Sequence, residues 1–113
     1  MAGYTKFTNL KVSGLLSALP EGVAITKNAN YTLAEDEKKF YIGITASAAS
    51  KTITLGLPDG AVCVVVNEGG SNAFTLKNVS GDSGTSIATG KAYLVRASTT
   101  ANATVLTLLN DGT

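Results

Sequence analysis

From Tyr31 onward, the sequence alternates between short segments that favour β-structure and clusters of turn-forming residues. The segments are rich in Val, Ile, Thr, Tyr and Phe, and the clusters contain Gly, Pro, Asn, Asp and Ser. A spacing of about ten residues between turn clusters leaves little room for crossover helices. The chain is therefore predicted to be all-β, as an antiparallel β-sandwich or a jelly-roll-like barrel of about eight short strands. The expected strands are 31–34, 39–45, 51–57, 61–67, 73–79, 85–88, 91–97 and 103–109.

The run 61–66 differs from the other expected strands because it is apolar on both faces. The segment 39–45, by contrast, places its large aliphatic residues on one face only, as a half-buried strand does. A strand that is apolar on both faces lies centrally between two layers, or packs one face against another subunit. Val62, Val64 and Val66 are therefore candidate residues of a subunit interface.

Residues 1–30 show no sustained helix or strand period, yet they are too apolar for a solvated disordered tail. They carry three lysines and one glutamate, a net charge of +2. We interpret 1–30 as an extended N-terminal arm that docks on a neighbouring subunit or another protein, and 31–113 as the β-domain. An N-terminal strand within the chain's own sheet is the alternative. The candidate contact residues of the arm are Tyr4, Phe7, Leu10, Val12, Leu15 and Leu16.

The composition excludes several classes of function. Only 15% of residues are charged and the net charge is +1, so neither nucleic acid nor an anionic membrane surface is indicated. The chain has no histidine and one cysteine, Cys63, which lies in an apolar run and is expected to be buried. Ser–His–Asp and Cys–His catalysis are therefore excluded, as are zinc sites built from His or from several Cys. No catalytic residue, cofactor or metal is expected, and neither a secretory signal nor a membrane span is recognised.

Three local features resemble parts of functional sites. The sequence GDSG, at Gly81–Gly84, also surrounds the nucleophile of chymotrypsin-like proteases, but Ser83 has no histidine base here, so a turn is favoured. The acidic run 35–37 lacks the ligand spacing of a calcium loop, and a charged surface loop is expected. Tyr41 and Tyr93 could form a small sugar-binding platform, although packing is the better interpretation of most of the aromatic residues.

The second half of the chain carries a recurring pattern of strands and turns. The residues KTITLGLPDGAVCVVVNEGGSNAFTLKNVSGDSGTSIATGKAYLVRA contain a strand, an LPDG turn, a strand ending at Asn67, a strand centred on Phe74, and a hairpin marked by Ile87, Gly90 and Lys91. This pattern resembles a β-rich module of tailed-bacteriophage virion proteins, found in head decoration proteins, head fibres and tail-fibre domains. The opening YTKFTNLKVSG is similar to the N-termini of small phage head proteins.

The resemblance implies a homotrimer on the outer capsid surface of a virion, made in the cytoplasm of the host bacterium. Its arm would grip the major capsid protein, its β-domain would project outward, and no catalytic residues are implied. A fibre would continue into a stalk or a receptor-binding tip, whereas this sequence stops at LLNDGT, which favours a decoration (cement) protein. The alternative is a head-fibre or tail-fibre adhesion module that binds host surface glycan.

Overall fold

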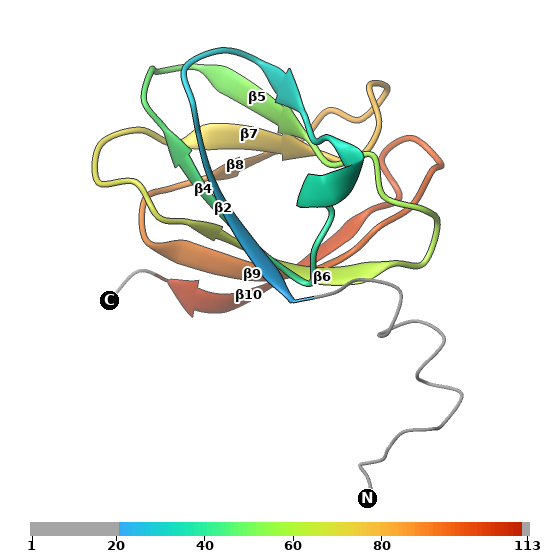
Figure 1. Cartoon of the computed structure of the whole chain (residues 1–113). Coiled ribbons are helices and arrows are strands. Elements are labelled where there is room, and N and C mark those ends of the chain that lie inside the picture. The colour runs from blue at the N-terminus through green and yellow to red at the C-terminus, as the bar shows by residue number, and fades with distance from the viewer. Residues whose placement is uncertain (1–20, 112–113) are drawn as a thin grey trace, which may run out of the picture.

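The computed structural model describes residues 21–111, which form nine β-strands and one short 3-10 helix (Figure 1). In chain order, the elements are β2 (Gly22–Lys27), β3 (Tyr31–Thr32), η1 (Glu35–Glu37), β4 (Tyr41–Ala46), β5 (Lys51–Thr54), β6 (Val62–Asn67), β7 (Phe74–Lys77), β8 (Thr85–Ile87), β9 (Lys91–Arg96) and β10 (Val105–Asp111).

The strands form two sheets that face each other as two layers (Figure 1). The five-stranded sheet has the order β10-β9-β6-β4-β2, and the four-stranded sheet has the order β3-β5-β7-β8. The prediction of an all-β fold is confirmed, because the described residues contain only three helical residues.

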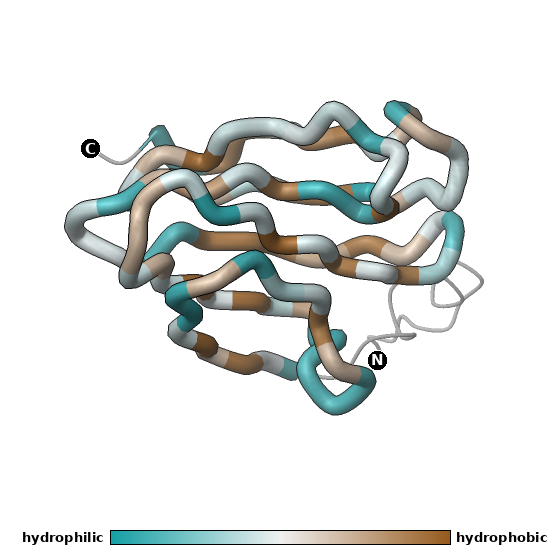
Figure 2. The backbone as a smooth tube through the Cα atoms, turned by 90° about the horizontal axis from the view of Figure 1, so that it is seen from above, coloured by the Kyte–Doolittle hydropathy of each residue, from teal (hydrophilic) through white to brown (hydrophobic). Residues whose placement is uncertain are grey.

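The core lies between the sheets and follows from the two-residue alternation of the strands. In β4, Ile42 and Ile44 point inward and are 0% exposed, while Tyr41 points outward. Figure 2 shows that apolar residues concentrate along the strands and hydrophilic residues at the connecting loops. The buried apolar residues are Ile25, Leu33, Ile42, Ile44, Ala46, Ile53, Leu55, Leu57, Ala61, Cys63, Val65, Phe74, Leu76, Ile87, Val95 and Ala97.

Strand pairing differs from the predicted antiparallel arrangement. The pairs β2–β4, β4–β6, β3–β5 and β5–β7 are parallel. The pairs β10–β9, β6–β9 and β7–β8 are antiparallel. The antiparallel prediction is wrong for the parallel pairs because each connection from β2 to β7 crosses from one sheet to the other. Strands that succeed one another in the same sheet therefore run in the same direction.

The first described strand lies ahead of the domain boundary expected at residue 30. Strand β2 forms one edge of the five-stranded sheet, and Gly22 to Lys27 pair in register with Tyr41 to Ala46 of β4. The sheet therefore includes part of the segment assigned to the arm. The candidate arm residues Tyr4, Phe7, Leu10, Val12, Leu15 and Leu16 lie outside the described residues.

Two buried asparagines connect the sheets at opposite ends of β6. At its C-terminal end, Asn67 donates from Nδ2 to the carbonyl oxygen of Ile87 over 2.9 Å. At the other end, Asn78 accepts the Leu57 N–H over 2.8 Å and donates from Nδ2 to the carbonyl oxygens of Leu57 and Ser98. Both side chains are 0% exposed, and the bonds satisfy polar atoms that would otherwise be costly to bury.

Candidate interaction surface

The outer face of the five-stranded sheet carries the residues predicted to form a subunit interface. Val62, Val64 and Val66 alternate with buried residues along β6, so they point away from the core and are half-buried by their neighbours. Because β6 is the central strand, β9 and β4 flank these valines on either side. The structure thus places the three residues together on one surface, and their role as an interface stays a prediction.

The register of the sheet identifies the other residues on this outer face. Val64 pairs with Leu94 of β9 and with Tyr41 of β4, and Gly43 pairs with Ala24 of β2. Most of these residues are apolar or small. The outward-facing strand residues are Gly22, Ala24, Thr26, Tyr41, Gly43, Thr45, Val62, Val64, Val66, Ala92, Leu94, Arg96, Val105 and Thr107.

One carboxylate lies on this face and is held in place. The hydroxyl of Tyr41 donates to Oε2 of Glu68 over 2.6 Å. The carboxyl group covers Gly43 so closely that a Cβ atom at that position would overlap it. The hydrogen bond to Glu68, followed by partial burial, raises the pKa of Tyr41, so its hydroxyl remains a donor at neutral pH.

The outer face of the four-stranded sheet has a different chemistry. Its residues carry hydroxyl groups and one ammonium group, and the registers of β3, β5, β7 and β8 bring them side by side. They are Thr32, Thr52, Thr54, Thr75, Lys77 and Ser86. Of the two outer faces, therefore, only that of the five-stranded sheet has the apolar character of a protein contact surface.

Large exposed apolar side chains also concentrate on the five-stranded sheet. Tyr41 is 38% exposed, and the edge strand β10 contributes Val105 at 53%, Leu108 at 47% and Leu109 at 55%. The register of β10 shifts between Leu108 and Asn110, as at a β-bulge. The apolar surface therefore continues from the sheet face around the β10 edge.

The two tyrosines that could bind sugar do not form a common platform. Tyr41 lies on the outer face of the five-stranded sheet, whereas Tyr93 lies on the inner side and packs against the core.

Cys63 is buried in the core, as expected from its apolar run. This burial raises the pKa of its thiol to about 12, so the sulfur stays protonated at neutral pH.

The acidic run forms η1, and the side chains of Glu35 and Glu37 have partners. Glu37 accepts hydrogen bonds from the Tyr31 hydroxyl over 2.7 Å and the Ala34 N–H over 2.8 Å, and Glu35 pairs with Lys38 over 2.6 Å.

Among residues 21–111, no group of three or more His, Cys, Asp or Glu side chains could hold a metal ion. In the same range no helix is long and apolar enough to span a lipid bilayer.

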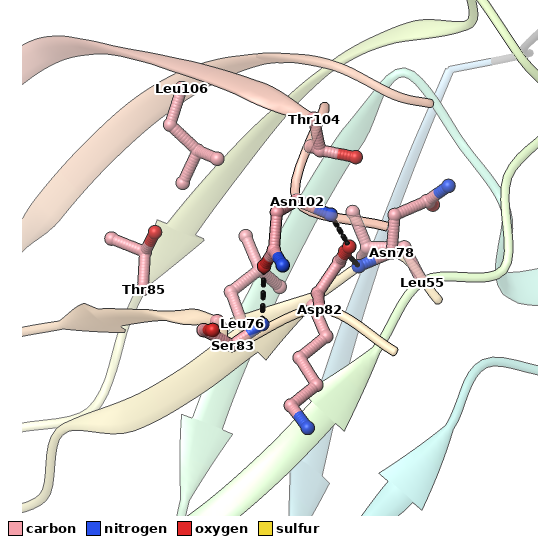
Figure 3. A pocket seen from close by; sticks show the side chains of 11 residues that line it. Leu55, Leu76, Asn78, Asp82, Ser83, Thr85, Asn102, Thr104 and Leu106 are labelled. Carbon is pink, nitrogen blue, oxygen red and sulfur yellow. Dashed lines mark hydrogen bonds between the residues drawn. The ribbon is translucent and has the colours of Figure 1, made fainter. Parts of the chain in front are cut away.

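The GDSG sequence lies beside a small cleft (Figure 3). Oδ2 of Asp82 accepts the N–H groups of Asn78 and Val79, and its Oδ1 accepts that of Asn102 over 2.6 Å. The backbone N–H of Ser83 in turn donates to Oδ1 of Asn102. The cleft has a volume of about 120 Å³, below the roughly 300–1,000 Å³ of small-molecule sites. Asp82 therefore joins two loops rather than facing a substrate.

Asp82 is expected to make stability depend on pH. Burial acts to raise the pKa of its carboxyl, but the three backbone donors, together with the charge of Lys77, outweigh burial and the pKa is lowered. A carboxyl whose folded-state pKa lies below its unfolded value adds stability that is complete above the unfolded pKa. That stability is lost as the pH falls through the folded pKa. Acidification from about pH 7 to about pH 3 is therefore expected to destabilise the wild-type protein more than the Asp82→Asn variant.

Thermal melts of both proteins at each pH measure this difference. Asp36→Asn, at an exposed position in η1, serves as the matched control and should follow the wild type. Equal acid destabilisation of the wild type and of Asp82→Asn would contradict the role given to Asp82.

Comparisons with protein-family models, with curated proteins and with solved structures found no match to this chain.

Proposed function

We propose that this chain is a capsid decoration (cement) protein of a tailed bacteriophage, which binds the major capsid protein lattice as a homotrimer and stabilises the head. In this proposal the two sheets form a β-sandwich on the outer capsid surface. An N-terminal arm containing Tyr4, Phe7, Leu10, Val12, Leu15 and Leu16 contacts the capsid. The chain has no role as an enzyme and needs no cofactor.

The observation that carries this proposal is the contrast between the two outer faces. One face is built mainly from Val, Leu, Ala and Gly, with three threonines, Tyr41, Arg96 and the Glu68 carboxylate among them, and the other from Thr, Ser and Lys. A protein that functions by contact needs one adhesive face and one face that tolerates water. The resemblance of the strand-and-turn pattern to phage virion modules is the reason for proposing the phage capsid as the partner.

Energetically, the proposal requires only ordinary interfaces. A standard protein interface buries roughly 1,600 Å² in total, and repetition over a shell multiplies the effect of each contact. Contacts between each trimer and several capsid subunits would oppose the outward pressure of packaged DNA.

The proposal is tested with expanded phage heads that lack their decoration protein. The purified chain is expected to bind these heads saturably, and deletion of residues 2–16 is expected to abolish binding while the melting temperature stays unchanged. Full binding after the deletion would overturn the arm assignment, and no binding by the intact chain would overturn the decoration role.

The glycan-binding fibre module has less support, because Tyr41 and Tyr93 lie on opposite sides of their sheet. Retention of the chain on a carbohydrate array, with loss in Tyr41→Ala, would favour this alternative.

A further inference from the structure

Strand β10 is a long sheet edge that lacks most of the features that prevent further pairing. The other edge strands are β2, β3 and β8. Strands β3 and β8 have only two and three residues, and β2 ends at Lys27. Short edges and lysine side chains discourage the addition of another strand. Strand β10 has seven residues, contains no Lys, Arg or Pro, and carries no charge before Asp111.

The inner side of β10 extends beyond the part of the core that the second sheet covers. Leu106 pairs with the buried Val95, and Leu108 pairs with Tyr93, which packs against the core. Residues directly opposite in a sheet point to the same side, so both leucines point inward. Leu106 packs against the core, whereas Leu108 is 47% exposed. The register shift of β10 comes after Leu108, so both leucines belong to the regular part of the strand.

A small cleft opens beside Leu106, between β10 and the other sheet (Figure 3). Leu55, Leu76 and Leu106 give the cleft its apolar walls, and Thr85 of β8 lies across from Leu106. Its volume of about 120 Å³ is close to the roughly 150 Å³ cavity that truncation of one core leucine leaves. The cleft is therefore the right size for one aliphatic side chain. Strand β10 thus carries an exposed leucine and, two residues away, a hollow that fits a leucine.

We infer that two copies of this chain pair through their β10 edges, antiparallel, about a two-fold axis that passes beside Thr107. In this pair Thr107 lies opposite Thr107 of the second copy, and Leu108 of each copy lies opposite Leu106 of the other. Leu108 of each copy then enters the cleft beside Leu106 of the other copy. Both unpaired edges are used, so the contact closes after two copies and does not grow into a fibre.

The chemistry of the strand favours a second copy as the occupant of this edge. A two-fold contact needs a surface that is complementary to itself, and the exposed leucine and the cleft beside Leu106 meet this condition on one strand. The segment 105–109 carries no charge, so the pairing brings no like charges together. The inference goes beyond the proposed function and does not depend on the homotrimer. A trimer built on another surface would use its β10 edges to link to a neighbouring trimer.

Thiol cross-linking tests whether two β10 strands meet at Thr107. Thr107 is exposed, and treatment of the full-length Thr107→Cys variant with a short bismaleimide is expected to give a covalent dimer on a denaturing gel. The wild type should stay monomeric on the gel, because its one cysteine, Cys63, is buried. Thr26→Cys, at an exposed position on the opposite edge strand β2, is the matched control and should also stay monomeric. No covalent dimer of Thr107→Cys, or equal cross-linking of Thr26→Cys, would overturn the inference.

A second substitution tests the contact between Leu108 and the cleft. In the Thr107→Cys background, Leu108→Lys places a charge at the mouth of the cleft and is expected to lower the initial cross-linking rate at least about tenfold. Leu108→Met keeps an apolar side chain and should retain most of the rate. Thr26→Lys is the control for added charge and should leave the rate unchanged. Thermal melts are used to confirm that every variant is folded, and an unchanged rate in Leu108→Lys would overturn the contact.

Two outcomes separate this inference from the proposed function. If Thr107→Cys gives no covalent dimer while the intact chain saturates undecorated heads, the pairing of β10 strands is wrong and the decoration role stands. If covalent dimers form but the chain does not bind heads, the decoration role is wrong and the pairing stands.

Discussion

Replacement of Asn78 by Asp is expected to lower the free energy of unfolding by about 3–5 kcal/mol at neutral pH. The substitution preserves the shape of the side chain but replaces the amide NH₂ with an oxygen. That oxygen would face the carbonyl oxygens of Leu57 and Ser98, to which Nδ2 of Asn78 now donates over 3.1 and 2.9 Å. The site is 0% exposed, so water cannot solvate the new charge. Urea unfolding followed by circular dichroism measures the change.

The variant should also acquire a distinctive pH dependence. Burial raises the pKa of the introduced carboxyl, because only one of its oxygens keeps a donor, the Leu57 N–H, while the other faces two carbonyl oxygens. The folded state therefore binds a proton more tightly than the unfolded state. The destabilisation is therefore expected to be smallest at or below the unfolded pKa of about 3.9 and to grow as the pH rises through the folded pKa.

Asn30→Asp is the matched control, because Asn30 is exposed and uses its Oδ1 to accept the Thr52 N–H, a role that a carboxylate retains. The control is expected to change stability by less than about 0.5 kcal/mol. Asn78→Asp with wild-type stability at neutral pH would contradict the role of Asn78 in joining the sheets.

Replacement of Gly84 by Ala is expected to lower the free energy of unfolding by about 2–4 kcal/mol. Gly84 has a φ angle of +87°, which side chains other than glycine adopt with strain. A Cβ atom there would also overlap Cγ2 of Thr75 and lie 3.3 Å from the carbonyl oxygen of Leu76. The loop that contains the GDSG sequence must therefore deform, and thermal or urea unfolding measures the loss of stability.

Two control substitutions show whether the loss of stability comes from the backbone of Gly84 itself. Gly70→Ala places its Cβ in open space, and stability should change by less than about 0.5 kcal/mol. Ser83→Ala should be equally mild, because Ser83 contributes its backbone N–H to the bond with Asn102. If Ser83→Ala were as damaging as Gly84→Ala, the interpretation of GDSG as a turn would need revision.

The positions of most strands could be predicted from sequence, whereas their pairing could not. Each expected strand from 31–34 to 103–109 overlaps one of the strands β3 to β10. Parallel and antiparallel strands share the same two-residue alternation, so the pattern does not distinguish them. Connections such as 47–50 and 68–73 resemble hairpin loops in composition, yet they cross between the sheets. Strand β2 is hard to recognise in the sequence because its segment, GVAITK, is short and lies between turn-forming residues.

The candidate surface was only partly visible in the sequence. A run that is apolar on both sides identified Val62, Val64 and Val66 as unusual. The residues that surround these valines on the outer face depend on which strands flank β6, and this requires the sheet order. The contact of Glu68 with Tyr41 and Gly43 likewise joins residues that only the parallel register of β4 and β6 brings together. The hydrogen bonds of Asn78 to Leu57 and Ser98 could not be predicted, because the sequence shows only a polar residue after an apolar strand.

The central position of β6 has a consequence for biosynthesis. One edge of β6 pairs with β4, which precedes it in the chain. The other edge pairs with β9, which is synthesised later and ends at Arg96. A nascent chain on the ribosome cannot complete the four-stranded sheet before β8 has been translated, or the five-stranded sheet before β10, because the antiparallel closing strands come last. Premature termination before Lys91 would leave β6 with an open edge of hydrogen-bonding groups, the form of strand most prone to aggregate.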